Sequence, residues 1–162
     1  MKHTHRKFVR IGFLLAALSI ILGAFGSHLL KKFLDQAALD TFEIGIRYQM
    51  FHALALIVLG ISHRKFSESR LNIALWLMIV GVIIFSGSLY ALSTRSIWGS
   101  DDFKFIGAIT PLGGLSFILA WLILFFGGFS NNEKYTAEKE EFTEESTPKK
   151  QRERKSSSSG KD

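Results

Sequence analysis

The apolar residues of this chain are gathered into four blocks that short polar segments separate. The blocks run from Ile11 to Leu30, Ile44 to Ile61, Leu71 to Leu92 and Phe105 to Phe129. Each is close to the roughly 20 residues that a helix needs to cross about 30 Å of hydrocarbon. The pattern therefore predicts an all-α fold, a four-helix transmembrane bundle formed by residues 1–129.

The hydrophobic pattern stops after Phe129. Residues 130–162 are rich in Glu, Lys and Ser, and they contain eight Lys/Arg and eight Asp/Glu. Such a composition buries too little apolar surface to offset the entropy lost on chain ordering. We therefore predict a disordered, charged C-terminal tail over 130–162. One interpretation is a solvated tail without a specific partner. The alternative is that its acidic stretch (138–145) and its basic stretch (149–155) are docking elements.

The formal charge of +6 comes from the membrane part, which has twelve Lys/Arg and six Asp/Glu. All but one of these basic residues flank the hydrophobic blocks, and the twelfth, Arg47, lies inside the second. This is typical of topology signals rather than of a nucleic-acid-binding surface. We therefore expect no nucleic-acid partner. The chain has no cysteine, which excludes disulfides, thiolate metal sites and a cysteine nucleophile.

The basic residues also predict the orientation of the bundle. Seven of them precede the first block or lie between blocks two and three, namely Lys2, Arg6, Lys7, Arg10, Arg64, Lys65 and Arg70. Only four lie in the other two loops, namely Lys31, Lys32, Arg95 and Lys104. Because positive residues stay inside, this bias predicts that both termini are cytoplasmic.

The start of the chain allows a second interpretation, a signal peptide cleaved after Ala24-Phe25-Gly26. The apolar run continues to Leu30, however, and its removal would leave three spans with the basic loops on conflicting sides. We therefore expect the first block to persist as a transmembrane helix.

Polar residues inside the blocks are informative because they are costly in hydrocarbon. With the predicted orientation they gather in the outer halves of the four helices, whereas the cytoplasmic halves are almost wholly apolar. The candidate polar cluster consists of His28, Glu43, Arg47, Tyr48, Gln49, His52, Ser86, Ser88, Tyr90 and Thr110.

The second block carries two polar faces. On one, Glu43 and Arg47 are four residues apart and predict an ion pair, with Asp40 as the expected N-cap. The other face carries hydrogen-bonding side chains and includes His52. This histidine is a proton acceptor, a ligand or a bonded packing residue.

Small residues predict where helices approach closely. Ser19, Gly23 and Ser27 recur every four residues on the first block, and Gly87 with Ala91 does so on the third. In the fourth block a broken helix that lines a substrate site is the alternative to tight packing.

Two further segments predict local features. Residues 32–39 mix apolar and polar positions at helical spacing, which indicates a short amphipathic turn along the outer interface. Pro111 either sits in the first turn of the fourth helix or kinks that helix.

The chain carries no Walker motif, no H-E-x-x-H motif and no G-x-S-x-G elbow. We therefore predict that the protein is not an enzyme, and we expect no catalytic residue, no cofactor and no metal site.

Four segments of the chain resemble a known family. They are Gly23-Ala24-Phe25-Gly26-Ser27-His28, residues 42–55 (FEIGIRYQMFHALA), Phe85-Ser86-Gly87-Ser88-Leu89-Tyr90 and residues 107–114 (GAITPLGG). Together they resemble domain of unknown function 423, small membrane proteins of bacteria whose eukaryotic relatives are called transmembrane protein 256. The resemblance covers roughly residues 12–127. It departs from the usual pattern at Ser27, where most members have alanine, and in the long charged tail.

This resemblance implies a multi-pass protein of the bacterial plasma membrane, with no established activity and no catalytic residues. We favour a non-enzymatic component that contacts lipid, itself or a membrane partner through the polar cluster. A small transporter or channel element is the alternative, with His28, Glu43, Arg47 and His52 along a path, although apolar cytoplasmic halves disfavour one. An outer-leaflet enzyme built on Glu43 and His52 lacks a nucleophile or a metal set.

Overall fold

The computed structural model describes residues 3–98 and 106–127. By its internal contacts the chain divides into Met1–Phe129 and Ser130–Asp162, and the division falls where the hydropathy changes. The predicted disordered tail, with its acidic and basic stretches, lies outside the described residues.

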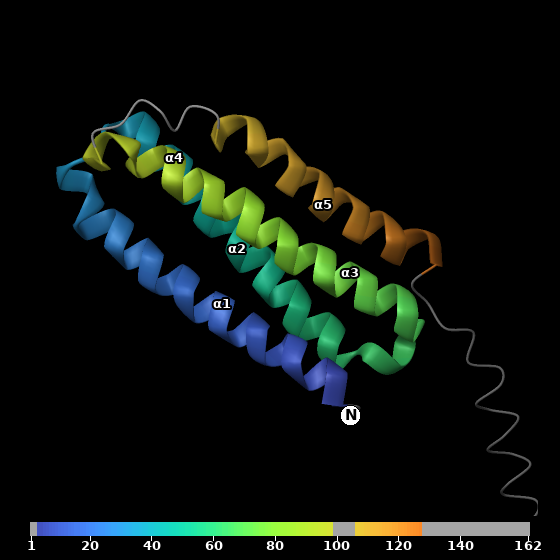
Figure 1. The fold of residues 1–162 in the computed structure, drawn as a ribbon. Helices are drawn as coiled ribbons and strands as arrows, with labels where there is room; N and C mark the ends of the chain where they lie inside the picture. Colours follow the sequence, from blue (N-terminus) through green and yellow to red (C-terminus); the bar gives the residue numbers. More distant parts are fainter. Residues whose placement is uncertain (1–2, 99–105, 128–162) are drawn as a thin grey trace, which may run out of the picture. The chain divides into compact units, whose positions relative to one another are not determined.

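The first half of the described chain is a helical hairpin (Figure 1). It consists of α1 (His3–His28), the 3-10 turn η1 (Leu30–Lys32) and α2 (Gln36–Ile61).

The second half follows a further 3-10 turn, η2 (His63–Lys65). It contains α3 (Glu68–Gly81), the π-helical segment η3 (Val82–Ser86), α4 (Gly87–Trp98) and α5 (Ile106–Gly127). The segments from α3 to α4 follow one another directly and form one span.

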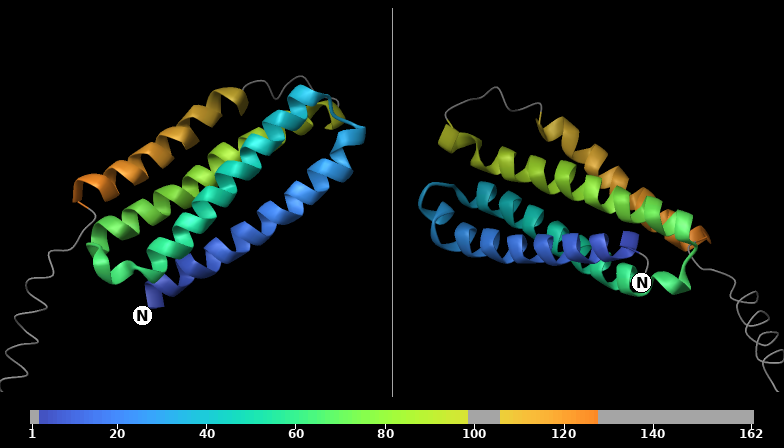
Figure 2. Two further views of the ribbon diagram at one scale, coloured as in Figure 1. Left: turned by 180° about the vertical axis from the view of Figure 1, so that it is seen from behind. Right: turned by 60° about the horizontal axis from the view of Figure 1, so that its bottom comes forward.

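Four stretches of the described residues are long and apolar enough to cross a membrane. They are His5–Lys32, Gln36–Ile61, Glu68–Ile97 and Ile106–Gly127. The predicted all-α, four-span architecture is therefore confirmed. An even number of spans returns the chain to its starting side, so α1 begins and α5 ends at the same end (Figures 1 and 2). We call this the terminal end, and the opposite end the distal end.

Helices α2 and α3–α4 form the centre of the bundle. Helix α1 packs on α2, while α5 packs on α3 and η3. Figure 1 and the left view of Figure 2 place α1 and α5 on opposite sides of this central pair. At the terminal end the Arg70 guanidinium donates to the carbonyl of Gly127 over 2.8 Å, and so caps the last turn of α5.

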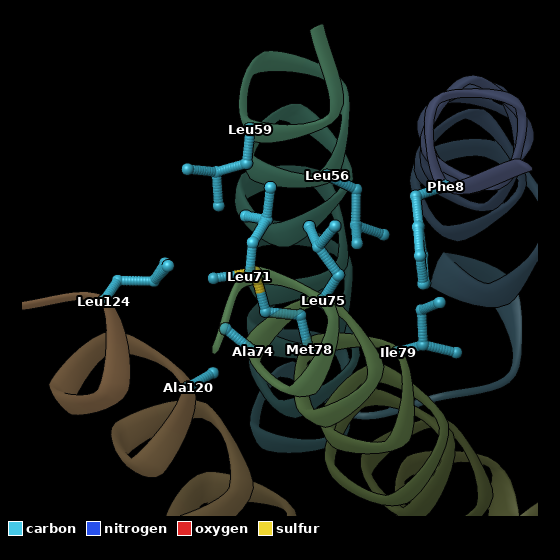
Figure 3. Packing of buried hydrophobic residues seen from close by; sticks show 10 residues of the cluster. All are labelled: Phe8, Leu56, Leu59, Leu71, Ala74, Leu75, Met78, Ile79, Ala120 and Leu124. Atoms are coloured by element: carbon cyan, nitrogen blue, oxygen red, sulfur yellow. The ribbon is translucent and has the colours of Figure 1, made fainter. Parts of the chain in front are cut away.

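The main hydrophobic core lies toward the terminal end (Figure 3). It contains the fully buried side chains of Phe8, Leu56, Leu71, Leu75 and Met78, to which α5 adds two smaller contacts from Ala120 and Leu124. The apolar halves of the helices, which the sequence predicts to be cytoplasmic, therefore form the closed core. A smaller cluster around Leu30, Leu34 and Phe42 closes the distal end.

The start of α2 differs from the prediction. The Asp35 carboxylate accepts the Ala38 N–H at 2.8 Å and is the N-cap, so the helix begins at Gln36. Asp40 was wrongly predicted as the cap, because it lies inside α2 and accepts from Gln36 Nε2 at 2.7 Å. The turn expected over residues 32–39 is replaced by the end of η1 and the first turn of α2.

The close helix contacts agree with the prediction only in part. A Cβ added to Gly23 or Gly87 would meet nothing within 4 Å, so these two glycines make no tight contact. The closest approach between backbones is at Gly113 of α5, in the block where tight packing is predicted, and an added Cβ there would lie 2.5 Å from the Phe85 backbone nitrogen. Gly12 has the same role between α1 and α2. Only glycine allows backbones to meet so closely.

The second half of the described chain, a second helical hairpin of α3–α4 and α5, contains two local features that bear on the regularity of its helices. The π-helical turn Val82–Ser86 was not predicted, and such turns insert a residue into an otherwise α-helical ladder. Pro111 lies inside α5, which nevertheless runs without a break from Ile106 to Gly127. Helix α5 is therefore not the broken helix that a lined substrate site would require.

Candidate functional site

The predicted polar cluster does not form one site. Some of its members are buried and hydrogen-bonded among the helices, and others are exposed, including two charged residues that line a crevice at the distal end. Gln49, Tyr90, His52, Ser88 and Thr110 take part in bonds between helices. Glu43 and Arg47 lie exposed on α2, and His28 lies exposed at the end of α1.

The first buried group joins three helices through Gln49. Its Nε2 donates to the carbonyl of Leu15 at 2.9 Å, and its Oε1 accepts the Tyr90 hydroxyl at 3.0 Å. Gly45 makes room for the tyrosine, because an added Cβ would lie 2.7 Å from the Tyr90 ring. Leu15 is near the middle of α1, so this group lies deeper than the outer layer that the sequence predicts.

The second buried group centres on His52. Its Nδ1 lies 2.8 Å from the Tyr48 carbonyl, and its Nε2 lies 3.4 Å from the indole nitrogen of Trp121. A carbonyl only accepts and an indole N–H only donates. The imidazole is therefore the neutral tautomer with its proton on Nδ1.

An aromatic cluster surrounds this histidine. The imidazole stacks on Phe117 with ring centroids 3.6 Å apart and planes 12° apart. Tyr48 contacts Phe85 at a centroid distance of 4.6 Å. Of the readings open for His52, its surroundings match the bonded packing residue.

The third buried group joins α4 to α5. The Ser88 and Thr110 hydroxyls lie 2.7 Å apart, and Ser88 donates to the carbonyl of Phe85 at 2.9 Å. Thr110 also has a carbonyl within reach, that of Ile106 at 3.4 Å, so either hydroxyl can donate to the other. Ser86 is fully buried nearby in sequence, and its hydroxyl has no hydrogen-bond partner in the described structure.

The exposed members of the cluster include the predicted ion pair, which is confirmed. Arg47 Nη2 lies 3.0 Å from Glu43 Oε2, and the side chains are 61% exposed for Glu43 and 64% for Arg47. Exposed here means turned toward the surroundings of the bundle rather than toward its core. His28 is also exposed, at the end of α1.

A crevice of about 400 Å³ lies beside this ion pair, between the end of α1 and the start of α2. Its polar lining includes Ser27, Lys31, Gln36, Glu43 and Arg47. Apolar lining comes mainly from α2 residues, namely Leu39, Phe42 and Ile46. We call this feature the distal crevice.

Residues 22–114 match the family described as "Protein of unknown function (DUF423)". The chain belongs to this family. The match covers most of the four-span region and includes the distal crevice. The resemblance seen in the sequence is therefore confirmed.

Similar DUF423-type proteins are bacterial membrane proteins. UPF0382 membrane protein SH2409 of Staphylococcus haemolyticus is 40% identical over 122 residues, which is 75% of this chain and 94% of the relative. UPF0382 membrane protein YwdK of Bacillus subtilis is 40% identical over 118 residues, or 72% and 91%. A UPF0382 membrane protein of Haemophilus influenzae is 35% identical over 117 residues, or 69% and 85%.

These names and the four apolar helices identify the chain as a multi-pass bacterial membrane protein, as predicted. No solved structure matches this DUF423 chain. Within the described residues, no group of three or more His, Cys, Asp or Glu side chains is placed to hold a metal ion.

Sequence reasoning missed several residues of these sites in the DUF423 chain. Lys31 was treated only as a topology signal, and Gln36 only as part of the amphipathic turn over residues 32–39. Trp121 and Phe117 were treated as part of an apolar span. A signal was present for Trp121, since an indole N–H in hydrocarbon requires an acceptor and the polar stripe on the second block offered one.

Proposed function

We propose that this DUF423 protein is a non-enzymatic membrane component that binds another molecule of the membrane at the distal crevice. The bound molecule is a lipid, another membrane protein or a second copy of the chain. The observation that carries the proposal is the division of the polar cluster into bonded buried groups and one exposed charged hollow.

The buried groups support a structural role for most of the cluster. Gln49 uses both ends of its amide on α1 and α4, and His52 uses both ring nitrogens on α2 and α5. Polar contacts of this kind hold transmembrane helices together. These side chains are therefore engaged within the bundle rather than presented to a ligand.

The distal crevice has the opposite character. Lys31, Glu43 and Arg47 line it and are exposed. Glu43 and Arg47 lie within a membrane span, where charged side chains are costly and are usually functional. A hollow lined by them is therefore the part of the described chain best suited to a binding partner.

An enzymatic function is less well supported. Glu43 is exposed and paired with Arg47, whereas His52 is buried against Phe117, so the two residues do not form one reactive site. Transport is also less well supported. A path through the bundle would have to cross the core around Leu56, Leu75 and Met78, which is fully buried and apolar.

Copurification tests this proposal. The full chain is purified from native membranes in mild detergent beside the variant Glu43→Gln/Arg47→Gln, and bound lipids and proteins are identified by mass spectrometry. We expect at least one species, including a second copy of the chain, to be retained by the wild type and lost from the variant. Lys32→Gln is the control, because Lys32 follows Lys31 but does not line the crevice. Identical bound species in all three preparations would contradict the proposal.

A further inference from the structure

We infer that the distal crevice binds the headgroup of an anionic phospholipid, with the lipid phosphate between Lys31 and Arg47. This inference rests on the proposed function and names the class of molecule that is bound. Four properties of the crevice lead to it: its depth in the membrane, the direction of Arg47, its net charge and its apolar wall.

The depth of the crevice matches a lipid headgroup. Helix α2 has 26 residues, so at 1.5 Å per residue it is about 39 Å long. The hydrocarbon layer is about 30 Å thick, so both ends of α2 extend into the headgroup region. Lys31 lies at the end of the first span and Gln36 begins the second. The mouth of the crevice is therefore at headgroup level.

The direction of Arg47 brings its charge toward that level. Side chains on a helix tilt toward the helix N-terminus, and Arg47 reaches back to Glu43 one turn earlier. Long basic side chains in a span extend toward the interface in this way. The bond to Glu43 occupies one of the five N–H donors of a guanidinium, which leaves others to meet phosphate oxygens.

The charge of the lining favours an anionic lipid over a zwitterionic one. Lys31 and Arg47 each contribute a positive charge and Glu43 contributes a negative charge, so the lining carries a net charge of one positive. A phosphatidylglycerol headgroup, with one net negative charge, complements this lining. Basic residues near a membrane surface attract such lipids.

An apolar wall runs beside the charged lining of the crevice, along the same stretch of α2. Leu39, Phe42 and Ile46 lie along it on α2, and Gly23 faces it from α1. A Cβ added to Gly23 would meet nothing within 4 Å, so the absent side chain leaves space there. An acyl chain that extends from the headgroup fits this wall. A free inorganic anion has no apolar part that would contact this wall.

The test is lipid binding by the full chain, solubilised in a neutral detergent, measured by native mass spectrometry. The lipids are phosphatidylglycerol, phosphatidylethanolamine and phosphatidylcholine with identical acyl chains. We expect wild type to prefer phosphatidylglycerol. Lys31→Gln and Arg47→Gln should each weaken this binding about fivefold, since each removes one basic residue near the surface. Lys32→Gln should bind as wild type does.

A steric variant tests the site without changing its charge. Gly23→Leu places a side chain in the open space of the crevice and should abolish phosphatidylglycerol binding. Leucine also favours a helix more than glycine does, so the fold should persist, which thermal unfolding checks. Gly87→Leu is the matched control, because Gly87 also has open space but lies on α4, away from the crevice.

The remaining outcomes separate this inference from the proposed function. Equal binding of the three lipids, or displacement of phosphatidylglycerol by millimolar inorganic phosphate, would overturn the inference. The chain could fail to bind any of the three phospholipids while the wild type still retains a protein or a different lipid that Glu43→Gln/Arg47→Gln does not. That result would overturn the inference and leave the proposed function standing. Absence of any crevice-dependent species in both experiments would overturn both.

Discussion

Trp121 of α5 donates its indole N–H to Nε2 of His52 on α2 over 3.4 Å, although the two residues are 69 positions apart in the chain. The bond joins the two hairpins of the bundle. It also fixes the proton of the imidazole on Nδ1, where the Tyr48 carbonyl accepts it. His52 therefore holds the fold by accepting on one side and donating on the other.

This relationship predicts coupling between the two residues. Trp121→Phe keeps an aromatic ring but removes the donor, and His52→Phe removes the acceptor. Each change should destabilise the bundle. The two together should cost less than their sum by about 0.6 kcal/mol, the average for such bonds between membrane helices, and by at most about 1.7 kcal/mol. A double-mutant cycle on unfolding in detergent measures the coupling. Additive losses would mean that the bond does not form.

The four spans could be predicted from the sequence because length and hydropathy are local properties. The Glu43–Arg47 pair could be predicted for the same reason, since an i,i+4 spacing fixes which side chains meet on one helix. Both predictions are confirmed. Neither required knowledge of how one helix faces another.

The bonds between helices were not predictable in this way. Gln49 was recognised as a polar residue that needs partners, but Leu15 and Tyr90 are 34 and 41 positions away. These partners depend on the rotation of each helix about its axis. The unpredicted π-helical turn Val82–Ser86 adds to the difficulty, because it changes that rotation within a span.

The small-residue contacts predicted at Gly23 and Gly87 are absent for the same reason. Gly23 and Gly87 sit on regular small-residue faces yet have open space around them, whereas Gly113 meets the backbone of Phe85. A small-residue pattern therefore identifies faces that are able to approach closely. It does not identify the face that another helix occupies.

The Tyr90 hydroxyl should stabilise the bundle through Gln49. Tyr90→Phe leaves Gln49 Oε1 without its donor inside the bundle, and a buried group left unpaired costs about 1–3 kcal/mol. Chemical unfolding in detergent measures the loss. Tyr48→Phe is the control, because Tyr48 is 42% exposed and no hydrogen bond of its hydroxyl is seen among the described residues. Equal losses of stability for the two variants would mean that the Tyr90–Gln49 hydrogen bond does not stabilise the bundle.

The close approach at Gly113 should be sensitive to a single methyl group. Gly113→Ala places a Cβ 2.5 Å from the Phe85 nitrogen, so α5 must move away from η3, and overpacking of this kind costs about 1–3 kcal/mol. Gly87→Ala has open space and should stabilise its helix by about 0.5–1 kcal/mol. Thermal unfolding of both variants should therefore shift in opposite directions. A harmless Gly113→Ala would show that the two backbones are not in contact.

The orientation of the bundle is predicted from the basic residues alone. A reporter fused after Asp162 should be active in the cytoplasm, and one inserted near Ser100 should be active on the outer side. The even number of spans requires the start of α1 and the end of α5 to share one side. An external C-terminus would reverse the orientation and would place the distal crevice in the inner leaflet.

The last prediction concerns the Glu43–Arg47 ion pair as part of the scaffold. Arg47→Ala leaves Glu43 as an uncompensated charge near the interface. The loss of stability should be below the roughly 2.5–3.5 kcal/mol that a charge costs at the centre of a membrane helix, because the pair lies nearer the surface. Glu43→Gln together with Arg47→Gln should recover much of this loss, since no charge then remains to be compensated. Unfolding of both variants in detergent measures the difference. If the double variant regains stability but still fails to retain its bound molecule, the pair serves binding rather than folding. If the double variant regains stability and also retains its bound molecule, the pair serves only the scaffold, and binding at the distal crevice does not depend on it.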